Sequence, residues 1–325
     1  MTGRVGVLVM AHGTPDTPEG IEAFYTRIRR GRPPTPELLA ELTGRYEAIG
    51  GTSPLTARTT AQVDGLAAAL EADDPGRFVV RLGTKYVHPT IEDGMAGLAA
   101  AGVDRVVGIV LTPHQSTMGS GEYFRRAEVA AGETDPPLAL TEIPSWYGSA
   151  NFAAILAERT RAALAGLDPS ARARTAVFFT AHSLPQRAVA DGDPYPDQVS
   201  ESGADIAALA DLDGDATVTW STAWQSAGRT ADPWIGPDLL AEMERVAAEG
   251  TTAVVVCPVG FVSDHLEVLY DLDIEARGKA DDLGIAFART TSLNDDPAFL
   301  ALLADVVRAA DHVAVTDSTA AGIRT

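Results

Sequence analysis

The chain has 325 residues, of which 46% are hydrophobic and 22% charged, a composition typical of a folded globular protein. Its formal net charge is -20, and Lys85 and Lys279 are its only lysines, which argues against a surface built to neutralise nucleic acid or anionic lipid. No stretch approaches the ~20 apolar residues of a membrane span, and the first apolar run, 5–10, is too short for a signal-peptide core.

Cys257 is the sole cysteine, so the chain forms no internal disulfide and cannot supply four thiolates to a zinc or iron–sulfur site. A reducing compartment suits this cysteine usage. We therefore expect a cytoplasmic protein that binds no nucleic acid and does not insert into a membrane.

Short β-branched runs alternate with stretches rich in Ala, Leu and Glu, a pattern typical of βαβ units around a parallel sheet. The runs predict strands over 5–11, 78–83, 106–112, 138–142, 175–181, 217–221, 253–258 and 285–288. Helical spacing predicts helices over 56–71, 91–101, 152–164 and 239–249.

The chain also repeats itself weakly. Residues 7–15 resemble 177–185, each an apolar strand that ends in Ala-His, a small residue, one further residue and proline. The pattern favours two similar α/β halves, each a parallel sheet flanked by helices. We expect an N-terminal lobe over 1–147, a C-terminal lobe over 148–310 and a flexible tail over 311–325.

Two histidines follow the matching strands. In open parallel sheets, ligands bind beyond the carboxyl ends of the strands, so His12 and His182 are expected to face one interdomain cleft. A single histidine after a strand is more often a hydrogen-bonded structural residue, and that alternative stays open for each of them.

An acidic segment follows the strand expected over 253–258. On an α-helix, four carboxylates at i, i+3, i+7 and i+11 form one stripe: Asp264, Glu267, Asp271 and Glu275. The stripe is either a solvated helix face with Asp264 as N-cap or a path for a divalent cation. Imidazole and carboxylate together suit Fe(II), Co(II), Ni(II) or Zn(II).

Five segments in one order resemble ferrochelatases: 46–55, 180–185, 192–198, 224–238 and 258–275. The resemblance implies two flavodoxin-like lobes with a porphyrin cleft between them. It implies that His182 and Glu267 are the catalytic pair that binds the metal and handles protons, and that Asp271 and Glu275 extend the metal path. No tightly bound cofactor is expected, because Fe(II) is a substrate, and no iron–sulfur cluster is expected, because Cys257 is the only cysteine.

The segments are most similar to the soluble Gram-positive branch that acts on coproporphyrin III. That similarity implies contacts to the porphyrin or its propionates from Arg29, Arg45, Tyr46, Ser53 and Tyr123. Guanidinium suits this role because it pairs bidentately with carboxylate. The alternative is that these residues belong only to helices and turns.

One position departs from that branch. His12 stands where the branch has a tyrosine that can bind the product iron axially, and we hypothesise that His12 is a substrate-binding residue that can ligate iron. The expected function is insertion of Fe(II) into coproporphyrin III by a monomer that works with other haem-pathway enzymes. The alternatives are a protoporphyrin IX ferrochelatase, a cobalt or nickel chelatase acting on another tetrapyrrole, and a haem or metal carrier.

Overall fold

A computed structural model describes residues 3–228 and 232–322, with side chains as far as Val313. Arg229, Thr230 and Ala231, part of one ferrochelatase-like segment, lie outside the described residues. The chain divides into two compact units. The first comprises residues 1–112, 118–146 and 294–325, and the second comprises 113–117 and 147–293.

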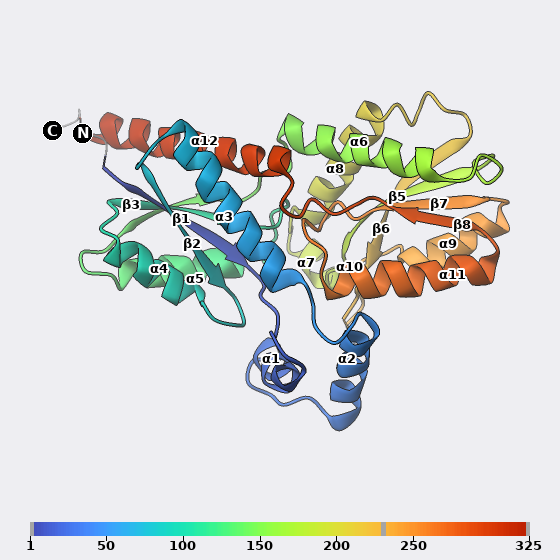
Figure 1. Cartoon of the computed structure of the whole chain (residues 1–325), viewed down its shortest axis with the longest axis horizontal. Coiled ribbons are helices and arrows are strands. Elements are labelled where there is room, and N and C mark those ends of the chain that lie inside the picture. Colours follow the sequence, from blue (N-terminus) through green and yellow to red (C-terminus); the bar gives the residue numbers. More distant parts are fainter. Residues whose placement is uncertain (1–2, 229–231, 323–325) are drawn as a thin grey trace. The chain divides into compact units, whose positions relative to one another are not determined.

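The first unit is built on a four-stranded parallel sheet of order β2-β1-β3-β4. The helices α3 (Leu55–Asp73) and α12 (Pro297–Gly322) cover one face, and α4 (Ile91–Ala100) and α5 (Ser120–Gly132) cover the other (Figure 1). Every residue of β1 is buried, which explains its continuous apolar sequence. The strands are β1 (Val5–Ala11), β2 (Phe78–Thr84), β3 (Arg105–Val110) and β4 (Ala139–Ile143).

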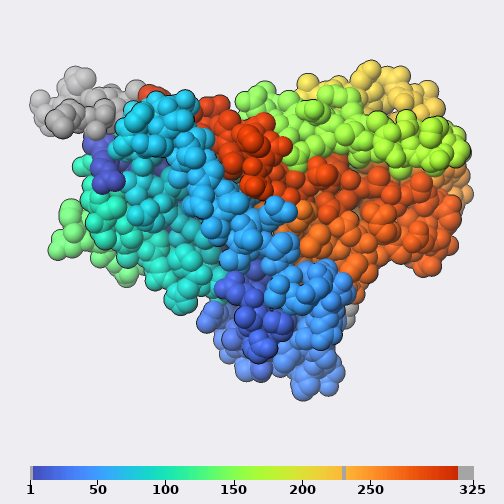
Figure 2. All heavy atoms as spheres, in the orientation of Figure 1, coloured from blue at the N-terminus to red at the C-terminus, as the bar shows by residue number. Residues whose placement is uncertain are grey.

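A helical segment follows the carboxyl end of β1 and protrudes from the first unit (Figures 1 and 2). It holds a 3-10 turn η1 (Pro18–Gly20), α1 (Ile21–Ile28) and α2 (Pro36–Ala48). Helix α2 begins where the Thr35 hydroxyl accepts the Leu38 amide, with Pro36 as the first helical residue. Three of the expected porphyrin-contacting residues lie in or beside these helices: Arg29, Arg45 and Tyr46.

The second unit repeats the sheet with the order β6-β5-β7-β8, again all parallel. Its strands are β5 (Thr175–His182), β6 (Val218–Gln225), β7 (Ala253–Cys257) and β8 (Ala286–Arg289). Helices α6 (Ala150–Gly166) and α8 (Tyr195–Leu209) lie on one face of the sheet, with α9 (Leu239–Ala248) and α11 (Arg277–Leu283) on the other (Figure 1). The short helix α7 (Gln186–Ala190) follows β5.

The expected fold class is confirmed, since all eight predicted strands form and they build two parallel sheets flanked by helices. The internal repeat is also structural. Strands β1 and β5 occupy the same place in their sheets, and His12 follows the first while His182 closes the second.

The division of the chain differs from the expected lobes, because α12 belongs to the first unit. The expected tail begins at Asp311, yet the helix continues to Gly322 and Asp311 is fully buried. Its carboxylate pairs with Arg77 and Arg105, which precede β2 and begin β3. Tertiary ion pairs therefore hold Asp311, the first residue of the expected tail, against the first sheet.

The segment 264–275 is not the continuous α-helix on which an acidic stripe was expected. Helix α10 (Leu266–Tyr270) is followed by a π-helix, η2 (Asp271–Ala276), whose turns are one residue wider than α-helical turns. Asp271, the first residue of the π-helix, is buried with 6% of its surface exposed, and Glu275 is exposed. The alternative in which Asp264 is the N-cap is also wrong, since His265 is the N-cap residue.

Candidate functional site

The carboxyl end of the second sheet brings together the two residues expected to be catalytic. His182 Nε2 lies 3.5 Å from Glu267 Oε1, and each side chain is about one-third exposed, at 33% and 34%. His182 Nδ1 lies 2.5 Å from the Ser183 carbonyl oxygen. A carbonyl only accepts, so Nδ1 donates, and the lone pair of a neutral ring is at Nε2, facing Glu267.

The two groups shift each other's ionisation. Burial alone would lower the pKa of His182, but the carboxylates of Glu267 and Asp271 and the Ser183 carbonyl outweigh it and raise that pKa to about 9. Burial alone would raise the pKa of Glu267, but His182 and His265 hold it well below its usual value. Without metal or porphyrin, the site is therefore an imidazolium–carboxylate pair at neutral pH.

A second imidazole flanks the same carboxylate. His265 Nε2 lies 3.5 Å from Glu267 Oε2, and His265 Nδ1 donates to the Ser263 carbonyl at 2.9 Å. Each carboxylate oxygen of Glu267 thus faces one imidazole. Sequence reasoning missed His265, although it stands two residues before Glu267, because its extended backbone as N-cap directs it back toward the carboxylate.

The other two expected metal residues differ in their relation to this pair. Asp271 accepts a hydrogen bond from the Ser226 hydroxyl and acts electrostatically on His182, whereas Glu275 is exposed. Across residues 3–228 and 232–322, no group of three or more His, Cys, Asp or Glu side chains is arranged to hold a metal ion.

His12 occupies the matching position in the first unit and is exposed beyond β1. Its Nδ1 donates to the Gly13 carbonyl at 2.9 Å, which places the lone pair of the neutral ring at Nε2, as in His182. The ring contacts Tyr86 edge-to-face at 4.8 Å between centroids and Phe24 at 5.9 Å. His12 is therefore held in a fixed orientation by a carbonyl and two aromatic rings.

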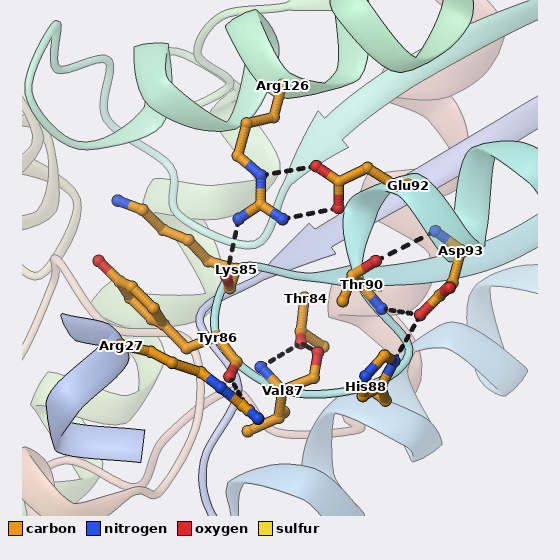
Figure 3. A network of polar contacts seen from close by, with 10 residues as sticks. All are labelled: Arg27, Thr84, Lys85, Tyr86, Val87, His88, Thr90, Glu92, Asp93 and Arg126. Atoms are coloured by element: carbon orange, nitrogen blue, oxygen red, sulfur yellow. Dashed lines mark hydrogen bonds and ion pairs between the residues drawn. The ribbon is translucent and has the colours of Figure 1, made fainter. Parts of the chain in front are cut away.

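The loop after β2 carries Tyr86, and two arginines donate hydrogen bonds to its backbone carbonyls (Figure 3). Arg27 donates to the Tyr86 carbonyl at 2.8 Å, and Arg126 donates to the Lys85 carbonyl at 2.7 Å. Arg126 also forms a two-pronged ion pair with Glu92. Gly13, at a φ of +81°, lets this loop approach, because a Cβ there would lie 2.6 Å from Val87 Cγ2.

The expected porphyrin-contacting residues of the first unit lie on its helices or in the turns beside them. Arg29 follows α1 and donates to the Arg32 carbonyl at 3.3 Å, and Arg45 lies in the last turn of α2. The Tyr46 hydroxyl lies 3.0 Å from that of Thr14, two residues after His12. Ser53 is buried and accepts the Leu55 amide.

Tyr123, on α5, is 8% exposed, and burial raises its pKa. The Lys85 ammonium lies 5.1 Å from the centroid of the Tyr123 ring and pairs with Glu122 at 2.6 Å. Tyr123 is therefore a neutral phenol beside a cation, which suits contact with an acidic group.

Residues 4–311 match the family model described as Ferrochelatase. A relative named "Ferrochelatase" from Herpetosiphon aurantiacus is 43% identical over 307 residues, which cover 94% of this chain and 99% of the relative. The chain belongs to the ferrochelatase family. A relative from Bacillus subtilis, named "Coproporphyrin III ferrochelatase", is 42% identical over 94% of this chain and 97% of its own length.

Family membership confirms the expected resemblance and the expected enzyme class, a lyase that acts on a porphyrin and a metal ion. A solved structure, "SirB from Bacillus subtilis with Fe3+", has a TM-score of 0.57 at 12% identity and covers 94% of this chain and 95% of its own. At that identity the likeness shows the fold alone. Among the described residues, no helix is long and apolar enough to cross a membrane.

Proposed function

We propose that this ferrochelatase-family chain inserts Fe(II) into coproporphyrin III. One observation carries the proposal: His182, whose Nδ1 is held by a backbone carbonyl, directs its Nε2 to within 3.5 Å of an ionised carboxylate at the carboxyl end of a parallel sheet. The similarity to proteins named coproporphyrin III ferrochelatase supports the choice of porphyrin.

Metal insertion requires two pyrrole protons to leave while a hydrated dication loses water and enters. In the proposal, His182 passes its own proton to Glu267, and its Nε2 lone pair then accepts a pyrrole proton or binds iron. These two uses exclude each other at any instant. Glu267 transfers protons outward and balances the incoming charge, so that two protons leave for one dication.

The first unit has the binding role in the proposal. Arg29 and Arg45 pair with propionates, since a guanidinium forms two parallel hydrogen bonds with a carboxylate. Tyr46, Ser53 and Tyr123 contact the porphyrin, and His12 binds the product iron axially. Binding energy from these contacts would distort the ring by about 1–5 kcal/mol, which tilts the nitrogen lone pairs out of plane.

We further propose that Asp271 and Glu275 extend the metal path, that no cofactor is tightly bound and that a monomer acts in the cytoplasm. The single cysteine and the net charge of -20 support this placement. Size-exclusion chromatography with light scattering measures the oligomeric state, and a dimer would contradict it.

The test is the initial rate of Fe(II) insertion, measured anaerobically by absorbance with coproporphyrin III and with protoporphyrin IX. We expect faster turnover of coproporphyrin III. His182→Ala should abolish insertion while leaving porphyrin affinity nearly intact, because it removes the lone pair and not the propionate contacts. His88→Ala is the matched control, since the His88 side chain is 78% exposed. Substantial turnover by His182→Ala would reject the role.

A cobalt or nickel chelatase is the second candidate, and His12 favours it because imidazole suits these metals. Parallel rates with Fe(II), Co(II), Ni(II) and Zn(II) separate the two. A carrier would bind porphyrin and Fe(II) in a single-turnover mixture without forming the metalloporphyrin.

A further inference from the structure

The segment that carries Glu267 is held at both edges of the second sheet. In the order β6-β5-β7-β8, β6 and β8 are the edge strands, and His182 closes the inner strand β5. Contacts from the carboxyl ends of both edge strands reach the stretch 264–273, within which Glu267 lies.

On the β6 side, the contacts come from two consecutive residues. Gln225, 3% exposed, accepts a hydrogen bond from the Thr180 hydroxyl at 2.8 Å and donates to the Glu267 carbonyl at 3.3 Å. The Ser226 hydroxyl donates to Asp271. Thr180 lies on β5 two residues before His182, so Gln225 links the strand of His182 to the backbone of Glu267.

On the β8 side, one guanidinium binds two carboxylates. Arg289 donates to both oxygens of Asp273, at 2.7 and 2.8 Å, and to Asp264 at 3.2 Å. Asp264 also accepts the Ser292 hydroxyl at 2.7 Å. Asp264 stands three residues before Glu267 and Asp273 six residues after it, so Arg289 holds the segment on both sides of the carboxylate.

The segment depends on these contacts because its helix changes period. Helix α10 continues directly into the π-helix η2 and then into α11, and π-helical turns are wider and rarer than α-helical turns. The contacts on both sides of Glu267 therefore help to fix its position. The Arg289 side chain is 14% exposed, so water competes little with its ion pairs.

We propose that Arg289 is a positioning residue that keeps the Glu267 carboxylate within reach of His182 Nε2, with the β6 contacts acting as the opposite anchor. The inference rests on the proposed roles of His182 and Glu267. Because the β6 anchor is separate, loss of Arg289 shifts the segment and leaves the unit folded.

The first test compares Arg289→Gln and Arg289→Lys with Arg245→Gln. Arg245 is a matched control, because it is half-exposed and pairs with Glu242 and Glu249 on the surface of the same unit. We expect Arg289→Gln to lower kcat about 10- to 100-fold with the KM for coproporphyrin III within twofold, since small misplacements have effects of that size. Arg289→Lys keeps the charge without the two-pronged geometry and should recover part of the loss.

The second test is a double-mutant cycle with Glu267→Asp, which shortens the carboxylate by one methylene and leaves a measurable rate. If Arg289 acts through Glu267, the fold-decrease in kcat of the double variant is smaller than the product of the fold-decreases of the two single variants. Independent losses that multiply, or Arg289→Gln with kcat within twofold of the parent, would overturn the proposal. Full activity of Glu267→Asp and Glu267→Gln would instead reject the role of Glu267 itself. If Arg289→Gln does not fold, Arg289→Lys and Asp273→Asn provide the same cycle.

Discussion

Three histidines share one hydrogen-bonding arrangement. His12, His182 and His265 each donate from Nδ1 to a backbone carbonyl within two residues of their own position. The bond fixes both the ring orientation and the tautomer, so Nε2 carries the lone pair in each neutral ring. These local hydrogen bonds thus orient the Nε2 atoms of the three histidines for proton transfer or metal binding in the absence of a ligand.

His12→Ala should change the absorption spectrum of the complex with the iron–porphyrin product, because an axial nitrogen ligand alters the electronic structure of the iron. The spectrum of the purified complex is recorded for the parent and for His12→Ala, with His88→Ala as control. Identical spectra for parent and His12→Ala would remove His12 from the set of iron ligands.

His114 should make the protein less stable in acid. Its side chain is 1% exposed, Nε2 bonds to the Ser202 hydroxyl at 2.8 Å, and Nδ1 has no hydrogen-bond partner among the described residues. Burial lowers its pKa to about 3. The unfolded chain, with an ordinary histidine pKa of ~6.5, therefore binds more protons between pH 6.5 and 3, and the free energy of unfolding falls as the pH drops through that window.

Between pH 7 and 5, the protonation of His114 in the unfolded chain should lower the free energy of unfolding by about 2 kcal/mol. Urea unfolding at several pH values measures it, and His114→Asn should show a shallower slope below pH 6.5. A parent and a variant with parallel pH profiles would contradict the assignment.

Of the site residues, the sequence identified those that end recognisable strands or lie in family-like segments. It identified His182 and Glu267, which the structure places together, and His12, which lies beyond β1. It missed His265, because the direction of a side chain at a helix entrance depends on a backbone angle that composition does not reveal. It missed Arg289 because ion pairs between strand ends and a distant helix leave no spacing pattern.

At the scale of elements, the inner strands β1, β3 and β7 were predictable because buried parallel strands are continuous, largely β-branched apolar runs. The π-helix was not, since the acidic residues of 264–275 have a spacing that fits an ordinary α-helix equally well. The widening occurs where Ser226 and Arg289 hold the segment from the two edge strands, and such long-range contacts are invisible in a local window.

Asp311 should anchor α12 to the first sheet. It is fully buried and pairs with Arg77 and Arg105, so Asp311→Ala leaves two guanidinium groups without their partner. We expect a loss of about 3 kcal/mol in unfolding free energy and faster hydrogen exchange of the α12 amides. Asp295→Ala, which removes a half-exposed pair with Arg58, should cost less than about 1 kcal/mol. Equal effects of the two substitutions would contradict the anchoring role.

At the scale of the whole molecule, a net charge of -20 creates a field that attracts cations. The KM for Fe(II) should rise several-fold between about 10 and 500 mM salt, as the Debye length falls from ~30 Å to below 8 Å. Initial rates at fixed porphyrin concentration measure this, with unfolding temperature monitored as a control. A KM independent of salt would show that the bulk charge serves solubility alone.

The chain passes between its two units four times, and the last passage, near residue 293, returns it to the first unit. During synthesis, the second unit consequently has all of its strands before the first receives α12, although the first was begun earlier. Until α12 is made, α3 alone covers that face of the first sheet, and the side of α3 that packs against α12 stays exposed. The second unit can therefore complete its fold before the first does, which reverses the usual amino-to-carboxyl order of folding.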